Sequence, residues 1–272
     1  MRQPPVRPGC TPGCSRSGAR FELHPFRQRR PRTVRSTKGN SRGNTAQHAQ
    51  DPRPHESMRI DIWSDPVCPW CAIGKAHLDQ ALARFEHADD VRVVWRSFEL
   101  DPGAPDVRAG QYDEQLAAKY GTSPQGGRSM VGRISAAADR AGIPARFDLV
   151  RPANTFDAHR LLHLAKDHGV QDLLAARLTR AYLTEGEVLS DHATLLRLAQ
   201  EVGLVAGEIT RTLSGDAHAE QVRADEAEAG RREVTAVPTF LIDGRVIIPG
   251  AQTPDSMLAT LRRAWAQQHS PT

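Results

Sequence analysis

The stretch SDPVCPWCAIG, Ser64 to Gly74, places two cysteines three positions apart around a proline and a tryptophan. It overlaps the end of MRIDIWSD, residues 58–65, in which apolar and polar residues alternate as they do in a β-strand. Residues 72–87 then place apolar side chains at helical spacing. The cysteine pair is therefore predicted to lie where a strand turns into a helix.

A second strand is predicted directly after this helix. Residues 91–100, VRVVWRSFEL, are rich in β-branched and aromatic side chains, and Asp-Pro-Gly at 101–103 closes the segment. Strand, helix and strand within about 45 residues have the length of a parallel βαβ unit.

The C-terminal part of the body is predicted to be a hairpin followed by a helix. Two apolar runs, Val237–Ile242 and Val246–Ile248, are joined through Asp243-Gly244, which is a strong hairpin signal. In the helix that follows, Thr253 is the expected N-cap and Pro254 lies in the first turn.

Between these two ends the sequence is helical in character. Five helical patterns follow one another over residues 104–215, most of them ending at a glycine, and they share no fixed repeat period, which argues against a solenoid. A further polar helix is predicted over 216–234. The fold class expected is α/β, a thioredoxin-like fold (βαβ … ββα) formed by residues 58–103 and 216–268, with an all-helical domain, 104–215, inserted after the second strand.

Charge is distributed unevenly along the chain. Residues 1–57 hold 12 Lys/Arg and 3 Asp/Glu, whereas the remaining residues hold 24 and 29. The first segment is rich in Arg, Pro, Gly and Ser, so we expect a disordered basic N-terminal tail. The acidic body gives no reason to expect a nucleic-acid partner. No run is long and apolar enough for a membrane span or a secretory signal, so a cytoplasmic location is expected.

A cysteine pair at a helix start is suited to redox chemistry. The unsatisfied N–H groups and the positive end of the helix dipole favour a thiolate at Cys68, the predicted nucleophile. Pro69 fits the first helical position, where no N–H is needed. Cys71, one turn further on, is the expected resolving thiol, and Trp70 is expected to pack beside the site.

A metal site is the alternative use of such a pair. It would need further soft or imidazole ligands at matching spacing. The remaining cysteines, Cys10 and Cys14, are spaced CxxxC in the N-terminal tail, and the histidines of the body are scattered along helices. No metal is therefore expected.

Pro238 is the second feature that bears on function. A proline in the first strand of a hairpin removes a ladder donor, so it belongs at an edge or carries a special peptide bond. An ordinary trans edge proline is one interpretation. In a thioredoxin fold the proline at this place is cis and faces the CxxC, and the CPWC upstream favours that interpretation. The backbone of Val237 would then bind an extended substrate by strand addition.

Four blocks together carry a resemblance to a known family: SDPVCPWCAIG, WRSFELDP, NTFDAHRLLHLA and AVPTFLIDGRVIIPGAQ. Over residues 58–268 they resemble the DsbA-like thioredoxin superfamily, and within it the FrnE-type branch of cytosolic proteins. The resemblance implies thiol–disulfide exchange, with Cys68 as nucleophile, Cys71 as resolving thiol and Pro238 as the cis-proline. The redox-active disulfide Cys68–Cys71 would then serve in place of a bound cofactor, and thiol- or disulfide-containing proteins would be the partners.

Relatives in the same superfamily supply the alternative function. Glutathione transferase kappa and hydroxychromene-carboxylate isomerase resemble the same blocks but usually carry serine at the nucleophile position. A glutathione-dependent transferase or isomerase acting on a small aromatic compound is therefore the second hypothesis, and a chaperone-like binder is the third. Retention of Cys68 and Cys71 favours redox chemistry, with glutathione as a conceivable co-substrate. The direction of exchange and the formation of a homodimer stay open.

Further residues are candidates for supporting roles. Asn154, His159 and Arg160 match a family block; Asn154 or Thr155 is expected to cap a helix, while His159 and Arg160 could line a substrate cleft.

Three titratable residues are expected in a turn or at the surface of the protein. Asp65 is interpreted as a turn residue, with proton exchange with the cysteines as the alternative. Asp61 is expected on an exposed strand face, although it could point inward as a buried acid. His163 is expected on a helix surface.

Overall fold

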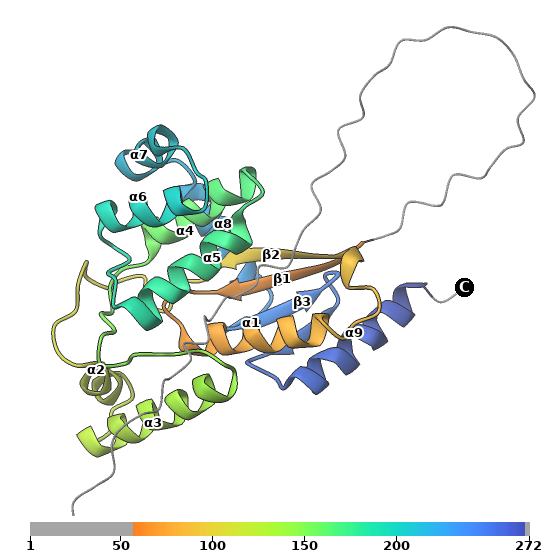
Figure 1. The fold of residues 1–272 in the computed structure, drawn as a ribbon, viewed down its shortest axis with the longest axis horizontal. Coiled ribbons are helices and arrows are strands. Elements are labelled where there is room, and N and C mark those ends of the chain that lie inside the picture. The colour runs from red at the N-terminus through yellow and green to blue at the C-terminus, as the bar shows by residue number, and fades with distance from the viewer. Residues whose placement is uncertain (1–56, 270–272) are drawn as a thin grey trace, which may run out of the picture.

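The computed structural model describes residues 57–269 (Figure 1). Its centre is a four-stranded mixed sheet with strand order β2-β1-β3-β4. β1 and β2 pair in parallel, β3 pairs antiparallel with β1, and β4 closes the hairpin with β3. The strands are β1 Met58–Ser64, β2 Val91–Ser97, β3 Thr239–Ile242 and β4 Val246–Pro249.

Helices cover both faces of this sheet because β1 buries side chains on both. Ile60 and Ile62 enter the main apolar core together with α1, Pro69–Leu82, and α9, Pro254–His269, which pack against each other. On the opposite face Trp63 packs on residues of α8, Ala219–Arg231, and its indole Nε1–H donates to the backbone carbonyl of Asp225 in that helix at 3.0 Å.

The remaining helices gather around the C-terminal ends of β1 and β2, on the left of Figure 1. Apolar side chains of this region belong to the same continuous core as β1 and α1, so the helices are packed onto the sheet layer. These helices are α2 Tyr112–Lys119, α3 Pro124–Arg140, α4 Phe156–Asp167, α5 Gln171–Arg180, the π-helical turn η2 Ala181–Glu185, α6 His192–Glu201 and α7 Ala206–Ser214. A short 3-10 turn, η1 Ala88–Asp90, lies between α1 and β2.

The thioredoxin-like fold with a helical insertion after the second strand is confirmed. Two strand limits differ from the prediction. β2 ends at Ser97 rather than at Leu100, and β3 begins at Thr239 rather than at Val237. The second difference has a direct cause, because Pro238 has no N–H to donate to the ladder. The N-cap at Thr253 is confirmed, since its hydroxyl accepts the N–H of Ser256 at 3.3 Å.

Two sequence predictions were wrong about burial. Asp61 is 6% exposed because its Oδ1 accepts from Arg96 Nε and from Arg59, both at 2.7 Å. His163 is also buried, because its ring contacts Asp225 Oδ2 at 3.1 Å and the Ser97 hydroxyl at 3.2 Å. These contacts join α4 and α8 to the central sheet.

The predicted tail, with Cys10 and Cys14, lies outside the described residues apart from Ser57. Within residues 57–269, no helix combines the length and the apolar character that crossing a bilayer requires.

Candidate redox site

Cys68 occupies the N-cap of α1. Its backbone is extended, Pro69 takes the first helical position, and the Cys68 carbonyl accepts the N–H groups of Cys71 and Ala72 at 3.1 and 3.2 Å. The Cys68 N–H donates to the Asp65 carbonyl at 3.0 Å, which closes the turn between β1 and α1. Both cysteines are free thiols, each 4% exposed. The loop therefore places two thiols at the start of one helix.

The cis-proline predicted from the sequence is present opposite this loop. The Val237–Pro238 peptide bond is cis, and the Cys68 Sγ lies 3.9 Å from the Val237 carbonyl oxygen, to which its S–H can donate. Gly74 permits the approach of the two segments, because a Cβ there would lie 2.7 Å from Pro238 Cγ and 3.2 Å from Phe240 Cζ. Residues about 170 positions apart thus form one site.

The surroundings of Cys71 oppose ionisation of its thiol. Burial raises the pKa of the Cys71 thiol well above its ordinary value, and its hydrogen bond and charge interaction with Cys68 raise it further. The Ser64 hydroxyl and the Asp65 N–H act in the opposite direction without reversing the shift. Cys71 is therefore held as a thiol at neutral pH, which suits the second step of a dithiol reaction.

Asp65 connects the cysteine loop to the helical insertion. Its Oδ1 accepts the N–H of Val67 at 3.2 Å, while Oδ2 accepts the N–H of Leu100 at 2.8 Å and the hydroxyl of Thr155 at 3.3 Å. The turn interpretation is confirmed, but the side chain is also buried. Burial raises the pKa of Asp65 to about 7, although these hydrogen bonds lower it.

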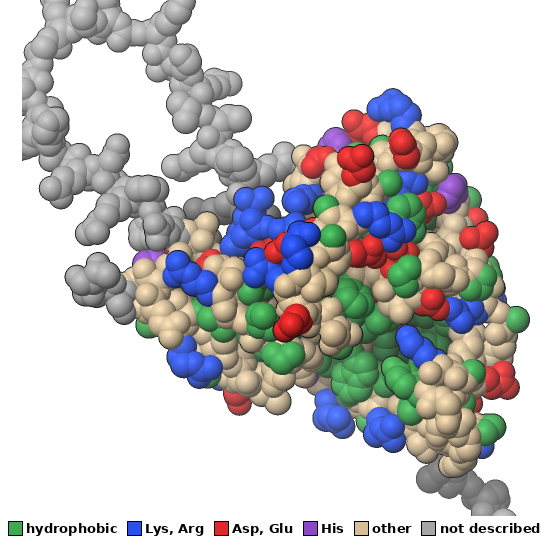
Figure 2. Space-filling model, turned by 180° about the vertical axis from the view of Figure 1, so that it is seen from behind, with side chains coloured by type: hydrophobic (Ala, Val, Ile, Leu, Met, Phe, Trp, Pro, Cys, Tyr) green, Lys and Arg blue, Asp and Glu red, His purple; other side chains and the backbone are tan. Residues whose placement is uncertain are grey.

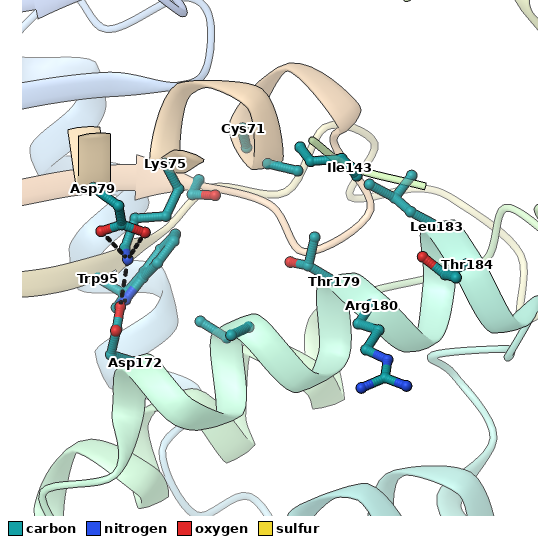
Figure 3. Close-up of a pocket in the computed structure, with 14 residues that line it drawn as sticks. Cys71, Lys75, Asp79, Trp95, Ile143, Asp172, Thr179, Arg180, Leu183 and Thr184 are labelled. Carbon is teal, nitrogen blue, oxygen red and sulfur yellow. Dashed lines mark hydrogen bonds and ion pairs between the residues drawn. The ribbon is translucent and has the colours of Figure 1, made fainter. Parts of the chain in front are cut away.

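A small cavity of about 30 Å³ lies behind Cys71 (Figure 3). Lys75, one turn along α1, places its ammonium 2.8 Å from Asp79 Oδ1 and 3.3 Å from Asp172 Oδ1. Burial alone would lower the pKa of Lys75, but the carboxylates of Asp172 and Asp79 raise it above its usual range. Lys75 is thus a permanent cation bound between two carboxylates, and we assign it a structural role.

The structure gives three other predicted site residues different surroundings. Trp70 is 41% exposed beside the cysteines, where a partner can reach it. Asn154 caps α4, since its Oδ1 accepts the Phe156 N–H at 2.9 Å. Arg160 is buried and donates to the backbone carbonyls of Thr212, in the last turn of α7, and of Gly215 and Ala217 beyond it, so its guanidinium is engaged within the fold.

His159 is fully buried next to Asp65. Its Nε2 lies 3.9 Å from Asp65 Oδ1, and neither ring nitrogen has a hydrogen-bond partner in residues 57–269. Burial lowers the pKa of His159 to about 3, so the ring is neutral at physiological pH. In this structure the side chain has no surface to offer a substrate.

Sequence reasoning missed a wide groove beside the site. A groove of about 820 Å³ begins at Asp65 and Val67 and runs between the loop after β2 and helix α2. Figure 2 shows a hollow with hydrophobic side chains on the half of the molecule that carries α2, with Lys and Arg at its edge. The lining residues are Asp65, Val67, Leu100, Asp101, Ala104, Pro105, Val107, Arg108, Ala109, Tyr112, Gln115, Leu116, Ala118, Lys119, Pro152, Ala153, Thr155 and Tyr182.

Within residues 57–269 no group of three or more His, Cys, Asp or Glu side chains is arranged to hold an ion.

A sheet of this topology, a dithiol at the start of α1 and a facing cis-proline define a thioredoxin-fold protein with a dithiol site. Comparison with known proteins is consistent with this class. Residues 59–262 match the DSBA-like thioredoxin domain family, and the chain belongs to that family. The resemblance to the DsbA-like superfamily inferred from the sequence is confirmed.

Similarity to individual proteins is consistent with membership of this family. The crystal structure of a protein described as a probable DsbA oxidoreductase, SCO1869 from Streptomyces coelicolor, is 39% identical; the match covers 79% of this chain and 92% of that one, with a TM-score of 0.74. YwbO of Bacillus subtilis (strain 168), described as uncharacterized, is 30% identical over 73% of this chain and 93% of its own. The cytosolic disulfide reductase DsbM from Pseudomonas aeruginosa, solved with GSH, shares the fold at 19% identity, with 76% and 98% coverage and a TM-score of 0.55.

Proposed function

We propose that the protein is a thiol–disulfide oxidoreductase that exchanges disulfides with thiol- or disulfide-containing proteins through Cys68 and Cys71. The observation that carries this proposal is the 3.9 Å separation between the Cys68 Sγ and the Val237 carbonyl, beside the cis peptide bond. A substrate strand that pairs with the Val237 backbone would place its own sulfur next to Cys68.

Reduction of a substrate disulfide by this dithiol proceeds in two steps. The Cys68 thiolate attacks one sulfur of the substrate disulfide, a mixed disulfide forms, and the other substrate sulfur leaves as a thiolate that takes up a proton. Cys71 then loses its proton and attacks the Cys68 sulfur. This step releases the second substrate thiol and leaves the Cys68–Cys71 disulfide. An external reductant, for which we propose two glutathione molecules or one protein dithiol of the cytoplasm, is itself oxidised to a disulfide and returns the pair to the dithiol.

Reduction of insulin with dithiothreitol as the reductant tests the proposal. Wild-type protein is expected to accelerate the reaction, Cys68→Ser to abolish the acceleration, and Cys71→Ser to accumulate a mixed disulfide at Cys68. Equal rates for wild type and Cys68→Ser would reject the proposal. If activity on a small aromatic compound with glutathione survives Cys68→Ser, the glutathione-dependent alternative holds instead.

A further inference from the structure

The Cys71 thiol must lose its proton before its sulfur can attack Cys68, and the residue is only 4% exposed. The Ser64 hydroxyl and the Asp65 N–H bond to the sulfur as donors, so neither is a base that could take this proton. A substrate strand paired with Val237 would cover the Cys68 side of the site. The proton therefore needs an acceptor that is reached from another side of α1.

The cavity behind Cys71 lies on such a side (Figure 3). The residues of α1 that line it after Cys71 share one helix face, being spaced i, i+3 and i+7: Ala72, Lys75 and Asp79. Gly74 lies on a different face of α1, the one that meets Pro238. The cavity also reaches the surface of the protein, because the side chain of Arg180, which lines it, is 53% exposed.

Asp172 lines this cavity from α5 and has one unpaired oxygen. Its Oδ1 accepts from Trp95 Nε1 at 2.9 Å and lies 3.3 Å from the Lys75 ammonium. Its Oδ2 is buried and has no hydrogen-bond partner among residues 57–269. A buried carboxylate oxygen without a donor is costly, so a donor that enters the cavity would be bound there.

The size and the lining of the cavity suit water. Its volume of about 30 Å³ exceeds the roughly 10–15 Å³ that one water molecule requires. A buried water needs about two to four polar partners, and the lining offers them in Asp172, Cys71, Ser64 and Thr179. Water in this cavity would connect the Cys71 thiol with the unpaired oxygen of Asp172.

We propose that Asp172 takes up the proton of Cys71 during the resolving step, through water held in this cavity. The Cys71 S–H bond breaks as its sulfur bonds to the Cys68 sulfur, and the proton passes through water to Asp172 Oδ2. The substrate sulfur leaves Cys68 with the electron pair of their bond. Asp172 then returns the proton to solvent, and the leaving thiolate takes up a proton from solvent. The inference rests on the exchange activity proposed for Cys68 and Cys71, to which it adds a proton acceptor from the helical insertion.

Dithiobisnitrobenzoate, a small disulfide, separates the reactions of the two thiols. Attack by Cys68 releases one coloured nitrothiobenzoate, and attack by Cys71 on the resulting mixed disulfide releases a second. Stopped-flow absorbance of wild type is therefore expected to show two phases. Asp172→Asn keeps an acceptor for Trp95 Nε1 and removes the base. It should leave the first phase unchanged and slow the second by about 100-fold at pH 7, the lower end of what a positioned base contributes.

The direction of this change distinguishes proton transfer from an electrostatic effect. Removal of a negative charge near Cys71 would by itself favour the thiolate and speed the second phase. Without Asp172 the thiol must ionise into bulk water. The second phase of Asp172→Asn should therefore rise by about tenfold per pH unit between about pH 6 and 8, where wild type should change little.

Two further variants complete the test. Asp139→Asn makes the same change at an exposed position of α3 outside the cavity, and both of its phases should match wild type. Ala176→Leu places extra carbon atoms in the cavity beside an intact Asp172, and it should slow the second phase by at least about tenfold without changing the first. The test thus does not depend on a single substitution.

Several results would overturn the inference. In Asp172→Asn, these are a second phase as fast as in wild type or faster, or an equal slowing of both phases. Unchanged phases in Ala176→Leu would also overturn it, as would a second phase slowed by Asp65→Asn alone, because Asp65 would then be the acceptor. Absence of the second phase in wild type is a different failure: Cys68 and Cys71 would then form no disulfide, and the proposed exchange function itself would be wrong.

Discussion

Asp65 is expected to make the stability of this protein depend on pH in an unusual direction. The carboxyl group is 1% exposed, and no lysine or arginine pairs with it among residues 57–269. The structure satisfies its oxygens with the N–H groups of Val67 and Leu100 and with the Thr155 hydroxyl. Replacement by Asn keeps the shape, removes the titration and leaves one of these donors without its acceptor.

The size of this contribution to the free energy of unfolding follows from the pKa of Asp65 in the folded protein. Burial raises the pKa of Asp65 from 3.8 to about 7, which corresponds to about 4 kcal/mol at about 1.4 kcal/mol per pH unit. Between these two pH values the folded protein holds a proton that the unfolded chain has lost. The contribution to the free energy of unfolding is therefore present at low pH, falls as the pH rises towards 7, and is constant above it. Between pH 5 and pH 8 about 3 kcal/mol is lost.

Asp65→Asn should not show this loss. At pH 5 the variant is expected to be less stable than wild type by about 1–3 kcal/mol, because one buried donor loses its acceptor. At pH 8 it should equal or exceed wild type, since wild type then carries a buried charge. Urea unfolding at pH 5 to 8 under reducing conditions measures both profiles.

A matched control comes from Asp191, which caps α6 at the surface and whose pKa is lowered by its hydrogen bonds to Thr194. Its stabilising contribution is lost only as the pH falls through that low value, so Asp191→Asn should run parallel to wild type between pH 5 and 8. If the profile of Asp65→Asn is also parallel to wild type, the assignment of Asp65 as a buried titrating acid is wrong.

Three further predictions concern the site and its support. Because burial keeps Cys71 protonated, brief treatment with iodoacetamide at pH 7 should modify Cys68 alone by mass spectrometry, and early modification of Cys71 would contradict this. Gly74→Ala should destabilise the protein by about 1–3 kcal/mol in urea unfolding and slow insulin reduction, since its Cβ would meet Pro238 at 2.7 Å; unchanged values would show that the approach tolerates a methyl group. Arg160→Met should cost about 3 kcal/mol by the same unfolding assay, because three carbonyls lose a buried donor, while Cys68 alkylation keeps its rate; a slower alkylation with intact stability would return Arg160 to the site.

Local patterns were sufficient to predict the central fold. The alternation in residues 58–65 and the helical spacing after Cys71 depend only on near neighbours, so strand, turn and helix could be read directly. Pro238 could be placed because a proline in a hairpin strand has few permitted positions. The parallel pairing of β1 and β2 then followed from the length of the connection between them.

Long-range contacts determined what the sequence could not show. His163 has the sequence setting of a surface residue, and only its contact with Asp225 on α8 explains its burial. Arg160 matches a family block but binds carbonyls more than 50 positions away. Tyr182 has no local signal at all, because the groove it lines is assembled from four separate segments of the chain. Periodicity carries no information about such distant partners.

Equilibration of the protein in glutathione redox buffers, with acid quenching and mass analysis of thiol-labelled peptides, tests the central claim most directly. The account predicts that Cys68 and Cys71 convert together between a dithiol and one intramolecular disulfide, with a tenfold change in the equilibrium for about every 30 mV. It is contradicted if the two thiols stay reduced throughout, or if each forms a glutathione adduct independently of the other.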